Sequence, residues 1–148
     1  IMSLGNPTSK MSKSDPAGCV FLMDSPEEIS RKFKRAITDS DTERCVRYDP
    51  ENKPGVANLM NIYASVTGKS FDEIESEFAG KGYGVFKPAV GDAVIETLRP
   101  IREEAERILA DKAYLKQVYT DGAMKASSVA RKTLRKVYKR VGLVEKPF

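Results

Sequence analysis

The stretch SPEEISRKFKRAIT, residues 25–38, carries a full set of helix signals. Ser25 suits the N-cap, Pro26 suits the first helical position, and Glu28 can return a hydrogen bond as the acid of a capping box. Apolar side chains then recur on one face at helical spacing as far as Ile37. This stretch therefore predicts an amphipathic helix, and the same kind of pattern sets the fold class of the chain.

Helical patterns cover most of the sequence after this stretch. The expected helices share apolar residues at helical spacing; they cover residues 54–67, the segment from Ser70 to just before Gly80, about 85–110, 111–119, and about 121–141. Pro100 lies inside the third of these and is expected to kink it or to mark a junction. The glycine-rich stretch 80–84 lacks the spacing of a phosphate-binding loop and is interpreted as a structural loop.

The first part of the chain has a different character. Residues 1–18 are punctuated by glycine, proline and serine, and the apolar run CVFLM, residues 19–23, predicts one short strand. The predicted fold class is mainly α: a helical bundle preceded by a loop and a single strand. We expect two parts, residues 1–23 and residues 24–148.

The composition of the 148 residues limits the classes of function. No apolar run approaches the roughly 18–20 residues that cross a membrane, so we expect no membrane partner. The chain has two cysteines and no histidine, which predicts neither a disulfide framework nor a metal site and makes the cytoplasm the default location.

The positive charge is concentrated at the end of the chain. Residues 123–148 carry a net charge of +7 within a total of +4. The candidate nucleic-acid-binding residues are the cations of the last helix: Lys125, Arg131, Lys132, Arg135, Lys136 and Lys139. An inward apolar stripe is expected beside them, formed by Ala123, Ala126, Ala130, Leu134, Val137 and Val141. Charge alone leaves open whether this is a solvated helix or a surface that attracts an anionic partner.

The loop PTSKMSKSDP, residues 7–16, is the second candidate site. Lys10 and Lys13 are flexible cations that suit phosphate oxygens, and Ser12, Ser14 and the backbone N–H groups could add hydrogen bonds. A mobile lysine loop can stabilise charge that develops during phosphate chemistry. The spacing alone favours a solvated surface loop or a modification site over a phosphate-binding loop.

Residues 10–14 are, letter for letter, the KMSKS signature of class I aminoacyl-tRNA synthetases. Further blocks follow in family order: IMSL (1–4) with PT (7–8), AITDS (36–40), KPGVANL (53–59), GKGYGVFK (80–87), ETLRPI (96–101) and GL (142–143). Over essentially its whole length, the chain resembles the bacterial tryptophanyl-tRNA synthetases. No chemical role is evident for the Thr38-Asp39-Ser40 part of these blocks.

The resemblance implies an ATP-dependent enzyme that activates L-tryptophan with Mg²⁺-bound ATP and transfers it to tRNA(Trp). Lys10 and Lys13 would be catalytic groups that contact the ATP phosphates. Ser12 and Ser14 would assist by hydrogen bonding, while Ile1 and Met11 would lie near the adenine.

The family also carries a second signature, HIGH or a variant, which is missing from this sequence. The resemblance therefore implies a C-terminal part of the enzyme. Residues 1–23 would be the edge of a Rossmann-type catalytic domain with the KMSKS loop, and residues 24–148 a helical tRNA anticodon-binding domain. Such a part is expected to be inactive alone. The family forms homodimers through the catalytic domain, which leaves a monomer as an open outcome for this chain.

Two alternative interpretations remain. One is another class I synthetase, such as the tyrosyl type, although the ordered downstream blocks favour the tryptophanyl type. The other is a stand-alone basic helical module that binds nucleic acid. Reading bases would require exposed rings, for which Tyr83, Phe86 and Tyr138 are candidates, although such rings more often belong to a core.

Overall fold

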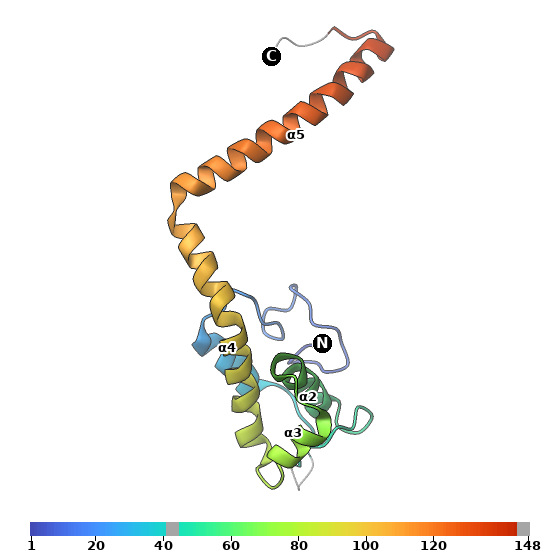
Figure 1. Ribbon diagram of the computed structural model, residues 1–148. Helices are drawn as coiled ribbons and strands as arrows, with labels where there is room; N and C mark the ends of the chain where they lie inside the picture. The colour runs from blue at the N-terminus through green and yellow to red at the C-terminus, as the bar shows by residue number, and fades with distance from the viewer. Residues whose placement is uncertain (41–44, 145–148) are drawn as a thin grey trace. The chain divides into compact units, whose positions relative to one another are not determined.

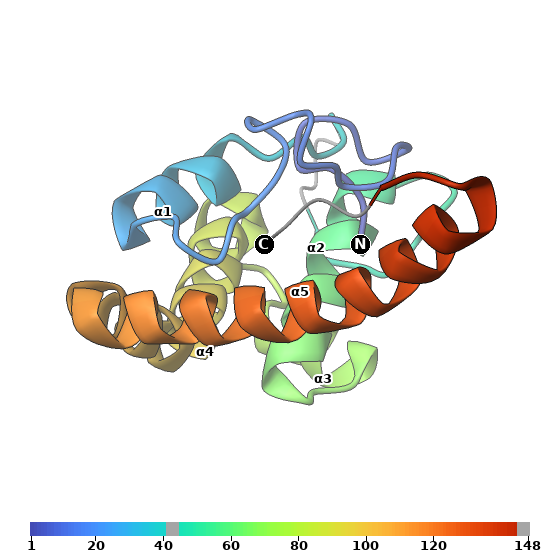
Figure 2. The same cartoon turned by 90° about the horizontal axis from the view of Figure 1, so that it is seen from above.

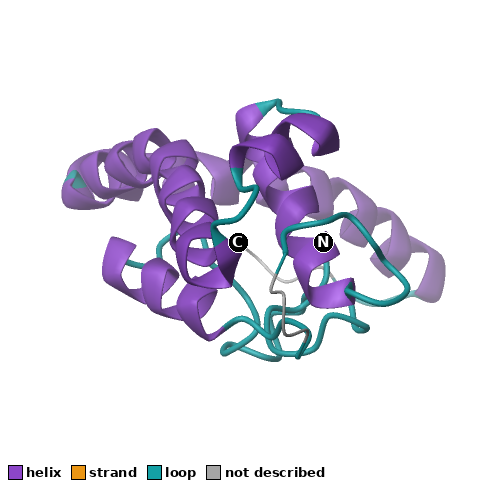
Figure 3. Ribbon diagram, turned by 90° about the horizontal axis from the view of Figure 1, so that it is seen from below, coloured by secondary structure: helices purple, strands orange, loops and turns teal. Residues whose placement is uncertain are grey.

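A computed structural model describes residues 1–40 and 45–144 and confirms the mainly α fold class. In the described part of the chain the helices are α1 (Pro26–Arg35), α2 (Pro54–Thr67), α3 (Phe71–Glu77), α4 (Gly82–Ala110) and α5 (Lys112–Val141). Figure 3 shows these helices joined by loops. The only β-type pairing among the described residues is an isolated bridge between Met2 and Lys10.

The capping box predicted at the start of α1 forms, and the pattern Ser70 to Glu73 forms a second one at the start of α3. At α1 the hydroxyl of Ser25 accepts a hydrogen bond from the Glu28 N–H at 3.2 Å, and the Glu28 carboxylate accepts one from the Ser25 N–H at 3.2 Å. Ser70 and Glu73 make the same reciprocal pair at the start of α3. The caps satisfy backbone N–H groups that a helix start otherwise leaves unpaired, which explains why these two starts were predictable.

Helix α1 ends earlier than its apolar pattern predicts. The helix stops at Arg35, and the backbone N–H of Ile37 donates to the carbonyl of Leu4 at 2.8 Å. Because this bond takes the chain into an extended contact with the N-terminal segment, the last residues of the predicted helix leave the helical path.

Two other expectations about elements are wrong. The apolar run 19–23 forms no strand; it is irregular, and Leu22 and Met23 are exposed. A strand needs a partner strand, and no described segment pairs with this one. The separate helices expected over 111–119 and 121–141 are one continuous helix, α5. Gly122 lies inside this helix and does not end it, because a single glycine weakens a helix without necessarily breaking it.

The chain divides into two compact units, Ile1–Arg102 and Glu103–Phe148. The first unit contains the hydrophobic core, in which α1, α2, α3 and the first turns of α4 contribute fully buried side chains: Ile29, Phe33, Val56, Leu59, Met60, Ile74, Phe86 and Val90. Phe78 and Phe86 meet edge to face with ring centroids 4.9 Å apart. The N-terminal loop lies beside α2 in both views of Figures 1 and 2. The expected boundary after residue 23 would separate the edge of a catalytic domain from a helical domain. The two compact units do not test that boundary, which stays a prediction.

The second unit is the last part of α4 followed by α5. No described residue of α5 is buried, so the structure does not show the inward stripe expected on the last helix. Leu134, Val137 and Val141 are 39%, 45% and 61% exposed. In the described part of the chain, no helix has the length and apolar character needed to cross a membrane.

Candidate functional site

The lysine loop is held closed by backbone pairing at its base. Met2 and Lys10 form the antiparallel bridge, and the Ser3 N–H donates to the Ser9 carbonyl at 2.8 Å. The Met11 N–H also donates to the carbonyl of Ile1, at 3.2 Å. The two limbs of the loop therefore lie side by side.

Helix α2 fixes this base through one buried side chain. Asn58 is 4% exposed, accepts a hydrogen bond from the Met2 N–H at 2.8 Å and donates to the Met2 carbonyl at 2.9 Å. The Leu4 N–H donates to the carbonyl of Gly18, which follows the loop in the chain, at 2.9 Å. Asn58, in the KPGVANL block, thus anchors the start of the chain by hydrogen bonding to both the backbone N–H and the carbonyl of Met2.

The two lysines of the loop are exposed, whereas Ser3 and Leu4 on its first limb are buried. Lys10 and Lys13 are exposed, and neither side chain contacts another described residue through a hydrogen bond or ion pair. Between them Met11 packs against the core. Ser12 accepts a hydrogen bond from the Ser14 N–H at 3.3 Å, which orders the turn. The structure thus brings the predicted phosphate-binding residues onto one loop and presents both ammonium groups to solvent; their roles stay predictions.

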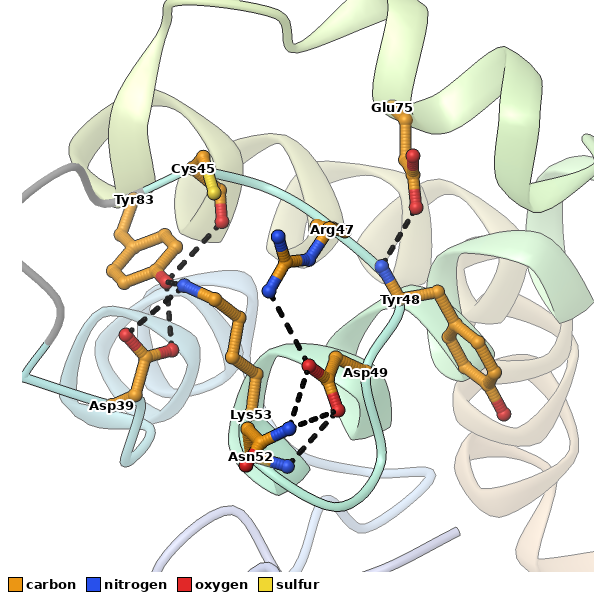
Figure 4. Close-up of polar contacts among 9 residues, drawn as sticks. All are labelled: Asp39, Cys45, Arg47, Tyr48, Asp49, Asn52, Lys53, Glu75 and Tyr83. Carbon is orange, nitrogen blue, oxygen red and sulfur yellow. Dashed lines mark hydrogen bonds and ion pairs between the residues drawn. The ribbon is translucent and has the colours of Figure 1, made fainter.

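A second polar cluster lies inside the first unit, and Figure 4 shows it. Lys53 is the N-cap residue of α2 and is only 3% exposed. Its ammonium lies 3.4 Å from the Asp39 carboxylate and donates to the Tyr83 hydroxyl at 3.1 Å. The Tyr83 hydroxyl in turn donates to Asp39 at 2.7 Å. A buried charge requires this kind of pairing, because desolvation disfavours an isolated ion.

The electrostatics of the cluster follow from its burial. Burial, together with the hydrogen bond to Asp39, raises the pKa of the Tyr83 phenol from 10.0 to about 12. The Lys53 ammonium opposes this shift in pKa but does not reverse it. Burial also lowers the pKa of Lys87 on α4, while the charge of Asp39 acts in the opposite direction. Tyr83 therefore stays protonated, and so remains a donor, across the physiological pH range.

This cluster braces the segment 45–53. The Tyr83 hydroxyl lies 3.3 Å from the Cys45 carbonyl, so the start of the segment is tied to α4. The Asp49 carboxylate accepts from the Asn52 backbone N–H at 3.0 Å and pairs with Arg47 at 3.3 Å. The segment is therefore held at both ends and cross-linked by its own side chains.

Sequence reasoning missed the Asp39–Lys53–Tyr83 cluster because its members are far apart in the chain. Each one lies in a different family block, AITDS, KPGVANL or GKGYGVFK, and these blocks were the available signal. Gly55 has a related role: a Cβ built on it would lie 2.2 Å from the Ile37 carbonyl oxygen. Helix α2 can thus approach the 37–39 segment only with glycine at this position, which places Lys53 beside Asp39.

The basic residues predicted on the last helix are all exposed on α5: Lys125, Arg131, Lys132, Arg135, Lys136 and Lys139. Of the ring residues named as base-stacking candidates, Tyr83 is 6% exposed and Phe86 is fully buried. These two rings therefore belong to the core, the more frequent case for such rings, and are not available for stacking, while Tyr138 is half-buried. Within residues 1–40 and 45–144, no cluster of histidine, cysteine, aspartate or glutamate side chains could hold a metal ion.

The region that contains the loop and the cluster matches a known family. A family model described as tRNA synthetases class I (W and Y) matches residues 1–99. The chain belongs to this family. The match covers the lysine loop, the Asp39–Lys53–Tyr83 cluster, helices α1 to α3 and the first part of α4, and so confirms the class I synthetase resemblance found in the sequence.

The similar proteins agree with the tryptophanyl type. A tryptophan–tRNA ligase of Wolinella succinogenes is 48% identical over 146 residues, which are 97% of this chain and 44% of the relative. A crystal structure of tryptophanyl-tRNA synthetase from Campylobacter jejuni, complexed with ADP and tryptophan, has a TM-score of 0.75 at 25% identity, covering 95% of this chain and 44% of that one. The chain spans less than half the length of the curated relatives it matches.

A tyrosyl-tRNA synthetase structure from Aeropyrum pernix is also similar, with a TM-score of 0.53 and 26% identity. It covers 80% of this chain and 36% of that protein. Within the family, the likeness to the Campylobacter tryptophanyl enzyme is closer and extends over more of the chain.

Proposed function

We propose that this chain supplies the ATP-phosphate loop and a tRNA-binding surface of a tryptophan–tRNA ligase. The whole reaction would activate L-tryptophan with ATP to tryptophanyl-adenylate and then transfer it to tRNA(Trp). The observation that carries the proposal is the pair of exposed lysines, Lys10 and Lys13, on a loop with a fixed base, in a chain of this family. The whole ligase is proposed to be a cytoplasmic homodimer.

The loop geometry suits phosphate binding. Lys10 and Lys13 can reach phosphate oxygens as mobile point charges, while the Asn58 anchor keeps the base of the loop in place. A Mg²⁺ ion bound with ATP would reduce the charge repulsion among its phosphates. Transition-state stabilisation in such chemistry is mainly electrostatic, so Lys13 is proposed to stabilise charge as pyrophosphate leaves.

Two apolar residues, Ile1 and Met11, are proposed to meet the adenine of the nucleotide. Ile1 is 63% exposed, and Met11 packs against the core beneath the loop. Both are apolar side chains suited to contact an adenine ring, and any polar contact there would come from their backbone groups. Ser12 and Ser14 would add hydrogen bonds to phosphate oxygens.

Substitution of Lys13 in a chimera tests the loop. The chain would replace the matching region of the Wolinella relative, and tryptophan-dependent ATP–pyrophosphate exchange would be measured. We expect Lys13→Ala to lower the exchange rate by about 10²- to 10³-fold, as loss of one electrostatic stabiliser does, with Lys10→Ala also impaired. Lys34→Ala, which removes an exposed lysine of α1, is the matched control. An active chimera that tolerates Lys13→Ala would refute this role.

The chain alone is expected to show no tryptophan-dependent exchange. Under this proposal the tryptophan pocket and the second signature lie in the part of the relatives that the chain does not match. Appreciable exchange by the pure chain would show that the proposed division of the active site is wrong.

The basic face of α5 is proposed to contact the anticodon arm of the tRNA. Exposed cations attract phosphates, and counterion release makes the resulting affinity depend on salt. Replacing Lys132 and Lys136 by alanine should lower the magnitude of the log–log salt slope by about 0.7–0.9 for each phosphate that is no longer neutralised. Fluorescence anisotropy with labelled tRNA(Trp) measures this slope, and an unchanged slope would remove these two residues from the interface.

A further inference from the structure

A hydrogen bond between two side chains joins the second limb of the lysine loop to its first limb. The Ser3 hydroxyl donates to the Asp15 carboxylate at 3.2 Å. Ser3 is 3% exposed, and its oxygen also accepts hydrogen bonds from the backbone N–H groups of Gly5 and Asn6, at 3.2 Å and 3.3 Å. One buried hydroxyl therefore ties the start of the loop to a residue that follows Lys13 closely in the chain.

Gly18 lies against this hydrogen bond and has no room for a side chain. A Cβ built on Gly18 would overlap both the Ser3 hydroxyl oxygen and an Asp15 carboxylate oxygen. Gly18 is itself buried, and its carbonyl accepts from the Leu4 N–H at 2.9 Å. The backbone therefore approaches the Ser3–Asp15 pair as closely as only a glycine permits, so the contact between the two limbs depends on this residue as well.

Asp15 also closes the turn that carries Lys13. The Asp15 N–H donates to the Ser12 carbonyl at 3.1 Å. Lys13 therefore lies inside a turn whose last residue is bound, through its side chain, to the buried hydroxyl of Ser3. A change in the position of Asp15 would move the backbone of Lys13 with it.

The chain on either side of this turn is fixed independently of the side-chain hydrogen bond. Before the turn, the Met11 N–H donates to the Ile1 carbonyl at 3.2 Å. After it, the ammonium of Lys32, whose side chain is 14% exposed, donates to the Cys19 carbonyl at 2.7 Å. Between these anchors, residues 15–17 line an open groove of about 740 Å³ between the loop and α1, which gives this limb space to move. The hydrogen bond is thus placed where it can hold or release the turn.

We propose that Asp15 is a positioning residue: its hydrogen bond with Ser3, the Ser3–Asp15 latch, holds the turn and so determines where Lys13 meets the phosphates of ATP. This inference rests on the proposed function, because it takes those phosphates as the target of Lys13. A charged group stabilises a transition state fully only when it is held in the productive geometry, and misplacement lowers the rate even though the group is present. The latch acts on the reaction through Lys13 and does not contact the substrate.

Cleavage by trypsin after Lys13 tests the latch in the chain alone, without any reaction. The rate at which a protease cuts a folded loop reports how often that loop opens. Ser3→Ala removes the donor and changes no residue near the cleaved bond. We expect it to raise the rate of cleavage about 10-fold, as loss of a hydrogen bond to a charged group does. Asp72→Ala, which removes an exposed carboxylate of α3, is the control and should leave the rate unchanged.

Two substitutions of Asp15 test the acceptor of the same hydrogen bond. Asp15→Ala removes the acceptor, whereas Asp15→Asn keeps an oxygen that can accept from Ser3 and should protect the loop better. Each cleavage rate is divided by that of a peptide of residues 7–18 with the same change, which corrects for the sequence preference of trypsin. Thermal unfolding by circular dichroism checks that each variant folds.

Activity of the chimera provides the second readout. Asp15→Ala should lower the maximal rate of tryptophan-dependent ATP–pyrophosphate exchange about 10-fold, and Asp15→Asn should lower it less. In a chimera that already carries Lys13→Ala, Asp15→Ala should cause no further loss, because Asp15 acts through Lys13. A merely structural role would lower the rate by the same factor in both backgrounds.

The outcomes separate this inference from the proposal on which it rests. If Lys13→Ala leaves exchange by the chimera unchanged, the proposed role of the loop fails, and the positioning role of Asp15 fails with it. If Lys13→Ala impairs exchange and Asp15→Ala has no effect, or the same effect in both backgrounds, the positioning role alone is refuted. Trypsin cleavage of Ser3→Ala at the rate of the unaltered chain would also refute it, because the hydrogen bond would then not hold the loop.

Discussion

Lys53 and Lys136 are both lysines in or beside a helix, yet they have opposite surroundings. Lys53 is 3% exposed and its ammonium is surrounded by Asp39 and Tyr83. Lys136 is exposed on α5, where no described residue is buried. In the first unit the charge is therefore paired inside the fold, whereas on α5 the charge is exposed, where the proposed tRNA partner could reach it. The same residue type can thus support the fold or the function, depending on what surrounds it.

Removal of Lys53 should produce the largest effect on stability. Lys53→Ala leaves the Asp39 carboxylate without its ammonium partner in a site where the carboxylate side chain is 13% exposed. Loss of one member of a buried ion pair typically costs about 3–5 kcal/mol in the free energy of unfolding. Urea unfolding followed by circular dichroism measures this cost.

The same change on α5 is the matched control. Lys136→Ala should alter the free energy of unfolding by less than about 0.5 kcal/mol, as exposed substitutions usually do. Equal effects of the two alanine substitutions would break the contrast between the two regions.

The next effect is a dependence of stability on alkaline pH. The pKa of Tyr83 is about 12 when folded, against an ordinary value of 10.0, so the stability it contributes is fully present below pH 10 and is lost as the pH rises toward 12. A shift of this size corresponds to about 2–3 kcal/mol. Unfolding free energies measured across this range should fall less steeply in Tyr83→Phe, which has no phenol to titrate there.

Tyr119 on α5 supplies the control for this titration. Its ring is 62% exposed, and Tyr119→Phe should retain the slope of the unaltered chain. If Tyr83→Phe retains that slope as well, the Asp39–Lys53–Tyr83 cluster does not hold the phenol protonated as described.

Alanine substitution of one glycine in each unit should change the free energy of unfolding by smaller amounts and in opposite directions. Gly55→Ala would place a Cβ against the Ile37 carbonyl and should destabilise the first unit by about 1–3 kcal/mol. Gly122→Ala, in a helix with nothing within 4 Å of the new Cβ, should instead favour the helix by about 0.5–1 kcal/mol. Urea unfolding and helical content by circular dichroism measure the two changes. Destabilisation by Gly122→Ala would indicate that α5 packs against something in this chain.

Local signals in the sequence predicted the parts of the fold that depend on near neighbours. Ser25 and Ser70 marked helix starts because a capping box lies within one turn of the chain. The lysine loop was predicted for the same reason, since Lys10 and Lys13 are close in sequence. The blocks of family resemblance added the chemistry expected of that loop, which its spacing alone did not favour.

The features that sequence reasoning missed depend on distant contacts. Asp39, Lys53 and Tyr83 meet only after α2 and α4 pack together, and no spacing rule joins them. Leu134 and Val137 show a different case, because their periodic pattern predicted an inward face and both side chains are exposed. The spacing of apolar residues predicts which face of a helix can be buried, whereas only the structure shows which segment that face contacts.

Hydrogen exchange of the backbone amides, with and without tRNA(Trp), tests the central claim that α5 is displayed for a partner while the first unit is held by its own packing. In the free chain, the amides of α2 and of the first turns of α4 should be strongly protected, whereas those of α5 should exchange rapidly. Addition of tRNA should protect α5 and leave the core of the first unit unchanged. Strong protection of α5 without tRNA, or no change when tRNA binds, would contradict this account.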